Sequence, residues 1–291
     1  MVYSIIRGYT CGGTVLLRIL NKNEKEELQR QGYMCEHLLC LYSMLSNQTA
    51  LYDDTFPVFI NNFREADVIL FGLGMDNVEK VECVKELLKL PINTLNIVSP
   101  TPLQKFPDLR IKYIDWDFHI SVDRFDFNLK GIPYKNIRYR LRQAEQMDYH
   151  TRLTKEFTSN HIYILSRHLT QHKFDVWDYE ELLSLDRFFR EHDHGMIMEV
   201  YRGDRLVGFD IVDFLEDNRI MVVPLGIYLE SSLTSDFLMY NNLKFARDNG
   251  YSWVDVGPAC GSAGLRSFKE KWFATPKFKL IVQTLTVKST Q

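Results

Sequence analysis

The segment between residues 250 and 273 constrains the fold more than any other part of the chain. It begins with the alternating strand pattern GYSWVDVG, which ends in Asp255 and Gly257. A loop of small residues follows, and residues 264–273 then combine basic and aromatic side chains at helical spacing. A strand, a tight loop and a short helix in this order hold one cation, Lys269, at a fixed place beside an aromatic wall.

The second half of the chain predicts a recognisable order of elements around this segment. Helical periodicity covers residues 157–171, 179–192 and 234–249, and strand patterns with turn residues between them cover residues 195–201, 206–214 and 219–228. Gly250 is the expected C-terminal stop of the last helix. Two helices, a meander of antiparallel strands, a helix and a strand is the order of elements in the GNAT acyltransferase fold.

The first half predicts a mixed layer of strands and helices. Strands are expected over residues 67–74, 95–98 and 110–120, and helices over residues 23–30, 78–90 and 134–147. Strand, helix and strand in succession is typical of an α/β layer. The sequence therefore predicts a mixed α/β (α+β) chain with a domain boundary near residue 145.

The segment at 250–273 resembles the C-terminal signature of two families, the Fem-type aminoacyl transferases and the catalytic domains of lysyl-phosphatidylglycerol synthases (DUF2156-like). Their strand reads G-x-x-x-x-D-x-G, and the helix after it reads G-L-x-x-F-K-x-x-F/W-G/A. Gly250, Asp255 and Gly257 match the first part, and GLRSFKEKWF matches the second. The resemblance implies two GNAT-like domains in tandem, a degenerate one at 1–145 and a second at 146–291.

The resemblance also implies catalytic roles for three residues. Lys269 would stabilise the oxyanion that forms as a carbonyl is attacked, which is worth roughly 3–4 kcal/mol for comparable donors. Phe268 would shape the pocket, and Asp255 would orient or deprotonate the acceptor. From the residues alone, Asp255 can equally cap the loop that follows it. Lys269 can equally belong to a solvated helix face, with Phe268 and Trp272 on the buried side.

A basic helix between the halves supplies candidate phosphate ligands. Its cations are Lys135, Arg138, Arg140 and Arg142, with Lys130 just before it. Arg138 and Arg142 are four residues apart and would form a two-pronged phosphate clamp. The alternative is an exposed charged helix in which these cations pair with Glu145. Gly257 and Arg266, both inside the signature, complete the predicted substrate- and phosphate-binding set.

Residues 229–236 bear on the acyl donor. Members of the fold that use CoA carry a glycine-rich turn at this point, whose N–H groups hold the pyrophosphate. This chain has no glycine there, and Glu230 and Asp236 would repel a pyrophosphate. We therefore expect no bound cofactor, and an aminoacyl-tRNA as donor rather than acyl-CoA. The alternatives are an N-acyltransferase that uses CoA or a carrier-protein thioester, and a non-catalytic GNAT-like binding module.

Composition limits the partners. A net charge of −3 and a pI near 6.3 exclude a protein that coats nucleic acid, although a local basic patch could still hold a tRNA acceptor end. The expected acceptor is an amine or hydroxyl of a small molecule or a lipid headgroup.

The five cysteines contain no C-x-x-C pair and the histidines no metalloprotease motif, so no metal is expected. Without a leader or an apolar run of about 20 residues, a cytoplasmic protein without a membrane span is predicted.

Overall fold

The computed structural model describes residues 22–30, 35–45, 48–52, 56–60, 65–70, 77–89, 92–104, 106, 108–172, 185–190, 195–229 and 232–287. The chain forms two compact units. Unit 1 comprises residues 1–117, 258–265 and 276–291, and unit 2 comprises residues 118–257 and 266–275. The boundary predicted near residue 145 falls inside unit 2. Four elements, two of them long strands, contribute residues to both units, so neither unit is a single continuous segment.

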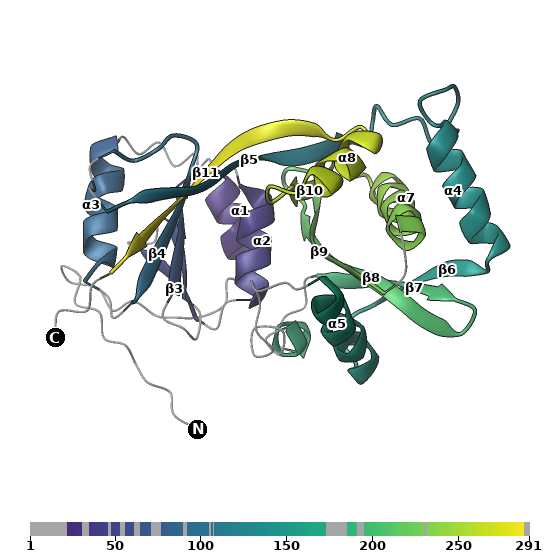
Figure 1. Ribbon diagram of the computed structural model, residues 1–291, viewed down its shortest axis with the longest axis horizontal. Helices are drawn as coiled ribbons and strands as arrows, with labels where there is room; N and C mark the ends of the chain where they lie inside the picture. The colour runs from purple at the N-terminus through teal and green to yellow at the C-terminus, as the bar shows by residue number, and fades with distance from the viewer. Residues whose placement is uncertain are drawn as a thin grey trace. The chain divides into compact units, whose positions relative to one another are not determined.

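Unit 1 is built on a mixed sheet in the order β1-β2-β3-β4-β11-β5. Figure 1 labels β3, β4, β11 and β5 of this sheet. Its strands are β1 (Gln48–Tyr52), β2 (Phe56–Ile60), β3 (Glu65–Ile69), β4 (Thr94–Ser99), β5 (Arg110–Ser121) and β11 (Thr275–Thr286), and its helices are α1 (Lys22–Arg30), α2 (Glu36–Leu45) and α3 (Asn77–Leu87). β3 and β4 are parallel and joined through α3, whereas β11 runs antiparallel to β4. The predicted strand–helix–strand layer is confirmed. β11 was not predicted.

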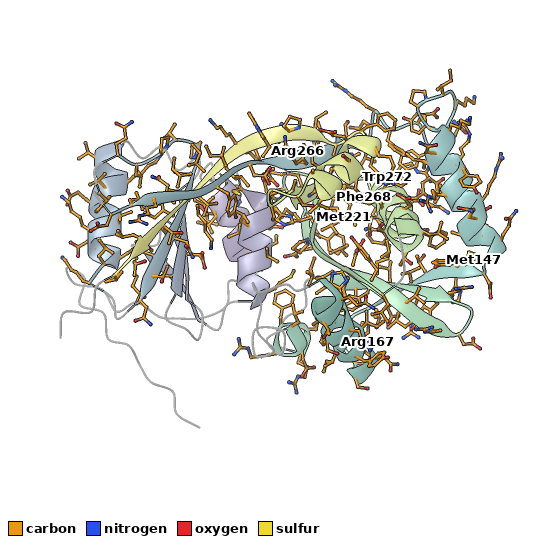
Figure 2. All side chains as sticks on the ribbon, in the orientation of Figure 1. Met147, Arg167, Met221, Arg266, Phe268 and Trp272 are labelled. Carbon is orange, nitrogen blue, oxygen red and sulfur yellow. The ribbon has the colours of Figure 1, made fainter. Side chains whose placement is uncertain are left out.

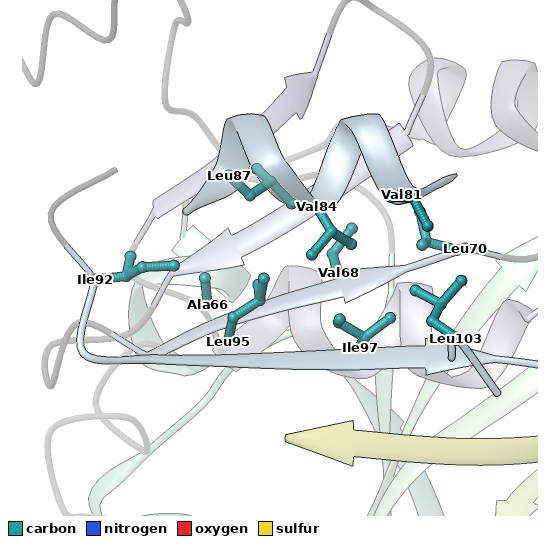
Figure 3. Packing of buried hydrophobic residues seen from close by; sticks show 10 residues of the cluster. All are labelled: Ala66, Val68, Leu70, Val81, Val84, Leu87, Ile92, Leu95, Ile97 and Leu103. Atoms are coloured by element: carbon teal, nitrogen blue, oxygen red, sulfur yellow. The ribbon is translucent and has the colours of Figure 1, made fainter. Parts of the chain in front are cut away.

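The two faces of this sheet have different helical cover. On one face, α3 packs its Val81, Val84 and Leu87 against Leu95 and Ile97 of β4 (Figure 3). On the other face, residues of α1 and α2 pack against β4 and β11; this cluster contains Leu28, Cys35, Leu38, Leu39, Val98, Leu280 and Val282, with Tyr113 and Phe278 at its margin. Because side chains alternate along a strand, these contacts fix which face every residue of β11 and β5 occupies.

Unit 2 follows the order β5-β10-β9-β8-β7-β6. Its elements are α4 (Lys135–Gln146), β6 (Tyr149–Thr154), α5 (Ser159–His172), β7 (Met196–Arg202), β8 (Arg205–Leu215), β9 (Ile220–Tyr228), α7 (Ser232–Asp248), β10 (Trp253–Pro258) and α8 (Ala263–Lys271), the last two ending or beginning in unit 1. β6 to β9 form an antiparallel meander, and β10 pairs in parallel with the first part of β9. The predicted meander, helix and strand are confirmed. Of the helix predicted over residues 179–192, residues 185–190 are described and helical.

Gly208 on β8 marks a place where the sheet and α7 approach closely. A Cβ added there would lie 2.9 Å from the carbonyl oxygen of Ile227, closer than real Cβ contacts, and 3.0 Å from Cγ2 of Thr234, which is also tight. We expect Gly208→Ala to lower the free energy of unfolding by about 1–3 kcal/mol, because the clash involves backbone.

Gly264 in α8 is the matched control for this substitution. A Cβ there would meet only Ser262 Oγ, at 3.9 Å. Gly264→Ala should therefore be neutral or stabilise by up to about 1 kcal/mol, since alanine favours helix. Chemical denaturation of both variants measures the difference, and equal stabilities would contradict the close approach at Gly208.

Candidate active site

The carboxyl end of β10 forms a sharp, buried turn. Asp255 is fully buried, and its Oδ1 accepts a hydrogen bond of 2.9 Å from the backbone N–H of Gly257. Gly257 has φ of +70°, in the left-handed region that glycine adopts without strain. The carboxylate thus holds the turn through a local hydrogen bond, as the loop-capping interpretation predicted. Its second oxygen, Oδ2, takes no part in this hydrogen bond.

Lys269 on α8 lies against this turn. Its side chain is buried (3% exposed), and its Nζ donates to the carbonyl oxygen of Gly257 at 2.6 Å and to that of Val256. The neighbouring Glu270 is exposed, so the helix turns Lys269 inward and Glu270 outward. The alternative in which Lys269 lies on a solvated helix face is therefore wrong. The structure thus shows a buried ammonium that donates to two backbone carbonyl oxygens at the end of β10.

The ring of Phe118, at the start of unit 2, faces two cations of α8. Lys269 Nζ and the Arg266 guanidinium each lie 5.9 Å from its centroid, a distance at which cations and aromatic faces attract. Arg266 is exposed, whereas Lys269 is buried. Phe268 is half-buried, and Lys271 Nζ lies 4.9 Å from its ring. The aromatic wall in contact with Lys269 is thus Phe118, and the role proposed for Phe268 stays a prediction.

The end of α8 is anchored to α7 through Asp236. This aspartate is buried, accepts a hydrogen bond of 2.9 Å from Trp272 Nε1 and pairs with Lys271. Figure 2 shows Arg266, Phe268 and Trp272 along α8 and just beyond it. Asp236 therefore makes its contacts inside unit 2, where it fixes the helix that carries Lys269. Glu230, the other acidic residue of the predicted donor segment, lies outside the described residues.

His119 is a candidate site residue that the sequence interpretation missed. It is 1% exposed, and its Nε2 lies 3.5 Å from Oδ2 of Asp255. Polar residues at every second position of the strand around it (D-W-D-F-H) were the available signal, since alternation places them on one face. Imidazole nitrogen and carboxylate oxygen are both atoms that bind metal ions, so this pair could contribute to a metal site.

The predicted phosphate residues of α4 have other partners or face solvent. Arg138 is half-buried, and its Nη1 donates to the carbonyl oxygen of Gly131 at 2.8 Å and to that of Leu129. Lys135 and Arg142 are exposed. Arg138 is thus engaged in holding the loop before α4, and the two-pronged clamp with Arg142 stays a prediction.

A second buried ionisable pair lies between α5 and β7. His161 Nε2 is 3.0 Å from Oε1 of Glu199, and both side chains are buried. Burial raises the pKa of the Glu199 carboxyl, and burial lowers the pKa of His161 to about 4. The backbone N–H of Thr158 donates to His161 Nδ1 at 2.9 Å, which makes that nitrogen an acceptor. The helical and strand patterns of the sequence did not indicate this pair, because α5 and β7 each have the pattern of an ordinary core element.

Comparison with known proteins identifies the fold. No family model and no curated protein matches the chain by sequence. The chain is similar in structure to the C-terminal domain (DUF2156) of an Agrobacterium fabrum protein named as a lysylphosphatidylglycerol synthetase, with a TM-score of 0.62, 14% identity, and 91% and 92% of the two chains covered. It is similar to FemX (TM-score 0.54, 10% identity, 91% and 96% covered).

A third similar structure carries the fold name. It is a tandem GNAT protein from the clavulanic acid biosynthesis pathway, with a TM-score of 0.57, 9% identity, and 95% and 100% of the two chains covered. Among the described helices, none has the length and apolar character needed to cross a membrane. From the order of its elements and these likenesses, the chain has the tandem GNAT-like fold.

Proposed function

We propose that this chain is an aminoacyl transferase that moves an amino acid from aminoacyl-tRNA onto an amine or hydroxyl of its acceptor. The observation that carries the proposal is the buried ammonium of Lys269, held by Val256 and Gly257 at the end of β10. Proteins of the same fold include one named as a lysylphosphatidylglycerol synthetase and FemX, which supports aminoacyl transfer over other chemistries of the fold.

In the proposed reaction, the acceptor nitrogen or oxygen attacks the ester carbonyl of the donor. A bond to the carbonyl carbon forms, the carbonyl oxygen becomes negative, and the acceptor gives up a proton. Collapse of this intermediate breaks the ester bond and releases the tRNA hydroxyl, which takes up a proton. Lys269 stabilises the negative oxygen, since a cation fixed in a water-poor site favours charge that exists only near the transition state.

Asp255 is proposed to hold both Lys269 and His119 in position. One carboxylate oxygen holds the Gly257 turn whose carbonyl accepts from Lys269, and the other lies 3.5 Å from the His119 imidazole. Loss of the carboxylate would therefore shift both the lysine and the histidine. The acceptor proton would leave through this His–Asp pair, since histidine is the side chain that most often transfers protons in enzymes.

The test uses tRNA charged with labelled amino acids and candidate acceptors, including phosphatidylglycerol vesicles and a mixture of small amines. Wild type should move the label to one acceptor, and Lys269→Ala should reduce the rate at least about 100-fold, equivalent to about 2.7 kcal/mol. Lys244→Ala, which removes an exposed cation of α7, is the control and should retain full activity.

Two results would contradict the proposal. A folded Lys269→Ala protein with a rate within about threefold of wild type, less than 1 kcal/mol, would remove the lysine from the chemistry. Thermal unfolding with acetyl-CoA tests the competing donor: a ligand present at 100 times its dissociation constant stabilises by about 2.7 kcal/mol. A clear upward shift with acetyl-CoA and none with aminoacyl-tRNA would favour a CoA-dependent acyltransferase.

A further inference from the structure

In unit 1, every second residue of β5 from Arg110 to Trp116 is exposed and is either basic or apolar. Arg110, Lys112, Ile114 and Trp116 are exposed, the last two by 51% and 38%. The intervening Tyr113 packs at the margin of the α1–α2 cluster, so the four exposed residues occupy the opposite face. This half of the strand therefore presents two cations followed by two large apolar side chains.

The neighbouring strand β11 adds cations to the same face. Its Phe278, Leu280 and Val282 belong to the α1–α2 cluster, so Lys277 and Lys279 point to the other side of the sheet, and both are exposed. β11 lies between β4 and β5. We call this surface the β5–β11 face; it consists of Arg110, Lys112, Ile114, Trp116, Lys277 and Lys279.

The pairing of β11 with β4 gives the same assignment independently. Gln283 lies opposite Ile97, and Val282 lies opposite Val98. Ile97 packs under α3, whereas Val98 packs under α1 and α2. The odd-numbered residues of β11 therefore share the α3 side of the sheet. The contacts of α3 in this cluster are to residues of β3 and β4, and the cations of β11 and β5 remain exposed.

The charge of this face is opposite to that of the whole protein. Four of its six residues are cationic, in a chain with a net charge of −3. One exposed acid, Asp108, lies two residues before the start of β5. A cluster of cations on a protein of negative net charge favours an anionic partner. Lys and Arg side chains that neutralise phosphates release the counterions bound there, and this release stabilises the complex. The exposed Trp116 adds a flat aromatic surface next to them.

We infer that the β5–β11 face binds unpaired nucleotides of tRNA, with Trp116 stacked on a base and the four cations on phosphates; the inference rests on the proposed function, which requires a tRNA donor. Single-stranded nucleic acid is held by this combination of basic side chains and aromatic platforms. An anionic membrane would also attract the cations. Membrane-surface proteins, however, bury the broad apolar face of an amphipathic helix, and this face offers two apolar side chains on a strand.

The test compares three charge-reversal pairs of equal formal charge. Lys112→Glu with Lys279→Glu removes two cations of the β5–β11 face. Lys85→Glu with Lys89→Glu, called the α3 pair, changes two exposed cations in α3 and in the turn directly after it, in the same unit. Lys135→Glu with Arg142→Glu changes the exposed cations of α4 in unit 2. Because all six positions are exposed, each protein should fold, which thermal unfolding verifies.

Binding is measured by fluorescence anisotropy with uncharged tRNA and a short unstructured RNA at several salt concentrations. The β5–β11 pair should weaken tRNA binding at least about tenfold at 0.1 M salt and make the slope of log K against log salt less negative by about 1.4 (two phosphates at about 0.7 each). Trp116→Ala should weaken binding of the short RNA by about fivefold or more without changing that slope. The α3 pair should bind like wild type.

The outcomes separate this inference from the proposed function. If wild type transfers the amino acid and binds tRNA, but the β5–β11 pair binds like the α3 pair, the inference is overturned and the proposed function stands. A loss confined to the α4 pair would place the phosphate contacts on α4 and also overturn it. Loss of binding to phosphatidylglycerol vesicles with RNA binding intact would make the face a membrane surface. A wild type that neither binds tRNA nor transfers an amino acid would remove the proposed function itself.

Discussion

Replacing Trp272 with alanine should lower the free energy of unfolding of this protein by about 3–5 kcal/mol. Trp272 is fully buried and is among the largest side chains in the interior. Its ring stacks on Phe125 at 6.1 Å, and its Nε1 donates to Asp236 at 2.9 Å. The substitution removes the ring, leaves a cavity, and leaves Asp236 Oδ1 with Lys271 in place of two donors, and these losses add.

Trp272→Phe separates packing from hydrogen bonding. Phenylalanine retains much of the ring but has no N–H group, so its cost should be about 1–3 kcal/mol, because Asp236 loses one of its two hydrogen-bond donors. Denaturant unfolding of the three proteins gives the comparison. Because Trp272 follows α8 directly, the alanine protein should also lose more transfer activity than the phenylalanine protein. Two variants each costing less than 1 kcal/mol would show that α8 is anchored elsewhere.

Replacing Asp210 with asparagine should change how the stability of the protein depends on pH. Asp210 is buried on β8, and Asn242 donates to its Oδ2 at 2.5 Å. Burial raises the pKa of the carboxyl to about 7 from 3.8, and the hydrogen bond from Asn242 opposes this shift only in part. Gly226 on the paired strand lies so close that a Cβ there would be 2.7 Å from Oδ1 of Asp210.

The sign of the effect follows from proton binding. Between about pH 4 and pH 7 the folded protein keeps the Asp210 proton, whereas the unfolded chain releases it. The unfolded state then binds fewer protons, so the free energy of unfolding falls as pH rises through this window. A shift of about three pKa units corresponds to a fall of about 4 kcal/mol between the two ends.

Asp210→Asn removes this titration without changing the shape of the side chain. The free energy of unfolding of the variant, relative to wild type, should therefore increase by about 4 kcal/mol between pH 4 and pH 8. Asp204→Asn, in the exposed turn between β7 and β8, is the control and should track wild type across the range. Parallel curves for Asp210→Asn and wild type would show that Asp210 is ionised in the folded protein.

Local pattern in the sequence predicted most of unit 2. The meander, the helix before Gly250 and the strand and helix around Lys269 follow from periodicity and turn residues, which act over a few positions. These elements and the resemblance predicted the tandem GNAT-like fold, and the structure confirms it. β11 was not predicted. It pairs with β4 across almost two hundred residues of chain, and local patterns do not record such a pairing.

The sequence by itself predicted the meander, helix and strand of unit 2 and marked Lys269, because strand alternation, helical spacing and glycine turns are local properties. It could not decide whether Lys269 or its neighbours face inward, since adjacent helix residues differ only by rotation about the axis. The tertiary structure decided that: the carbonyl oxygens of Val256 and Gly257 receive Lys269, while Glu270 remains exposed. It also brought His119 to Asp255 from another strand, and such contacts between distant segments depend on packing that no local pattern records.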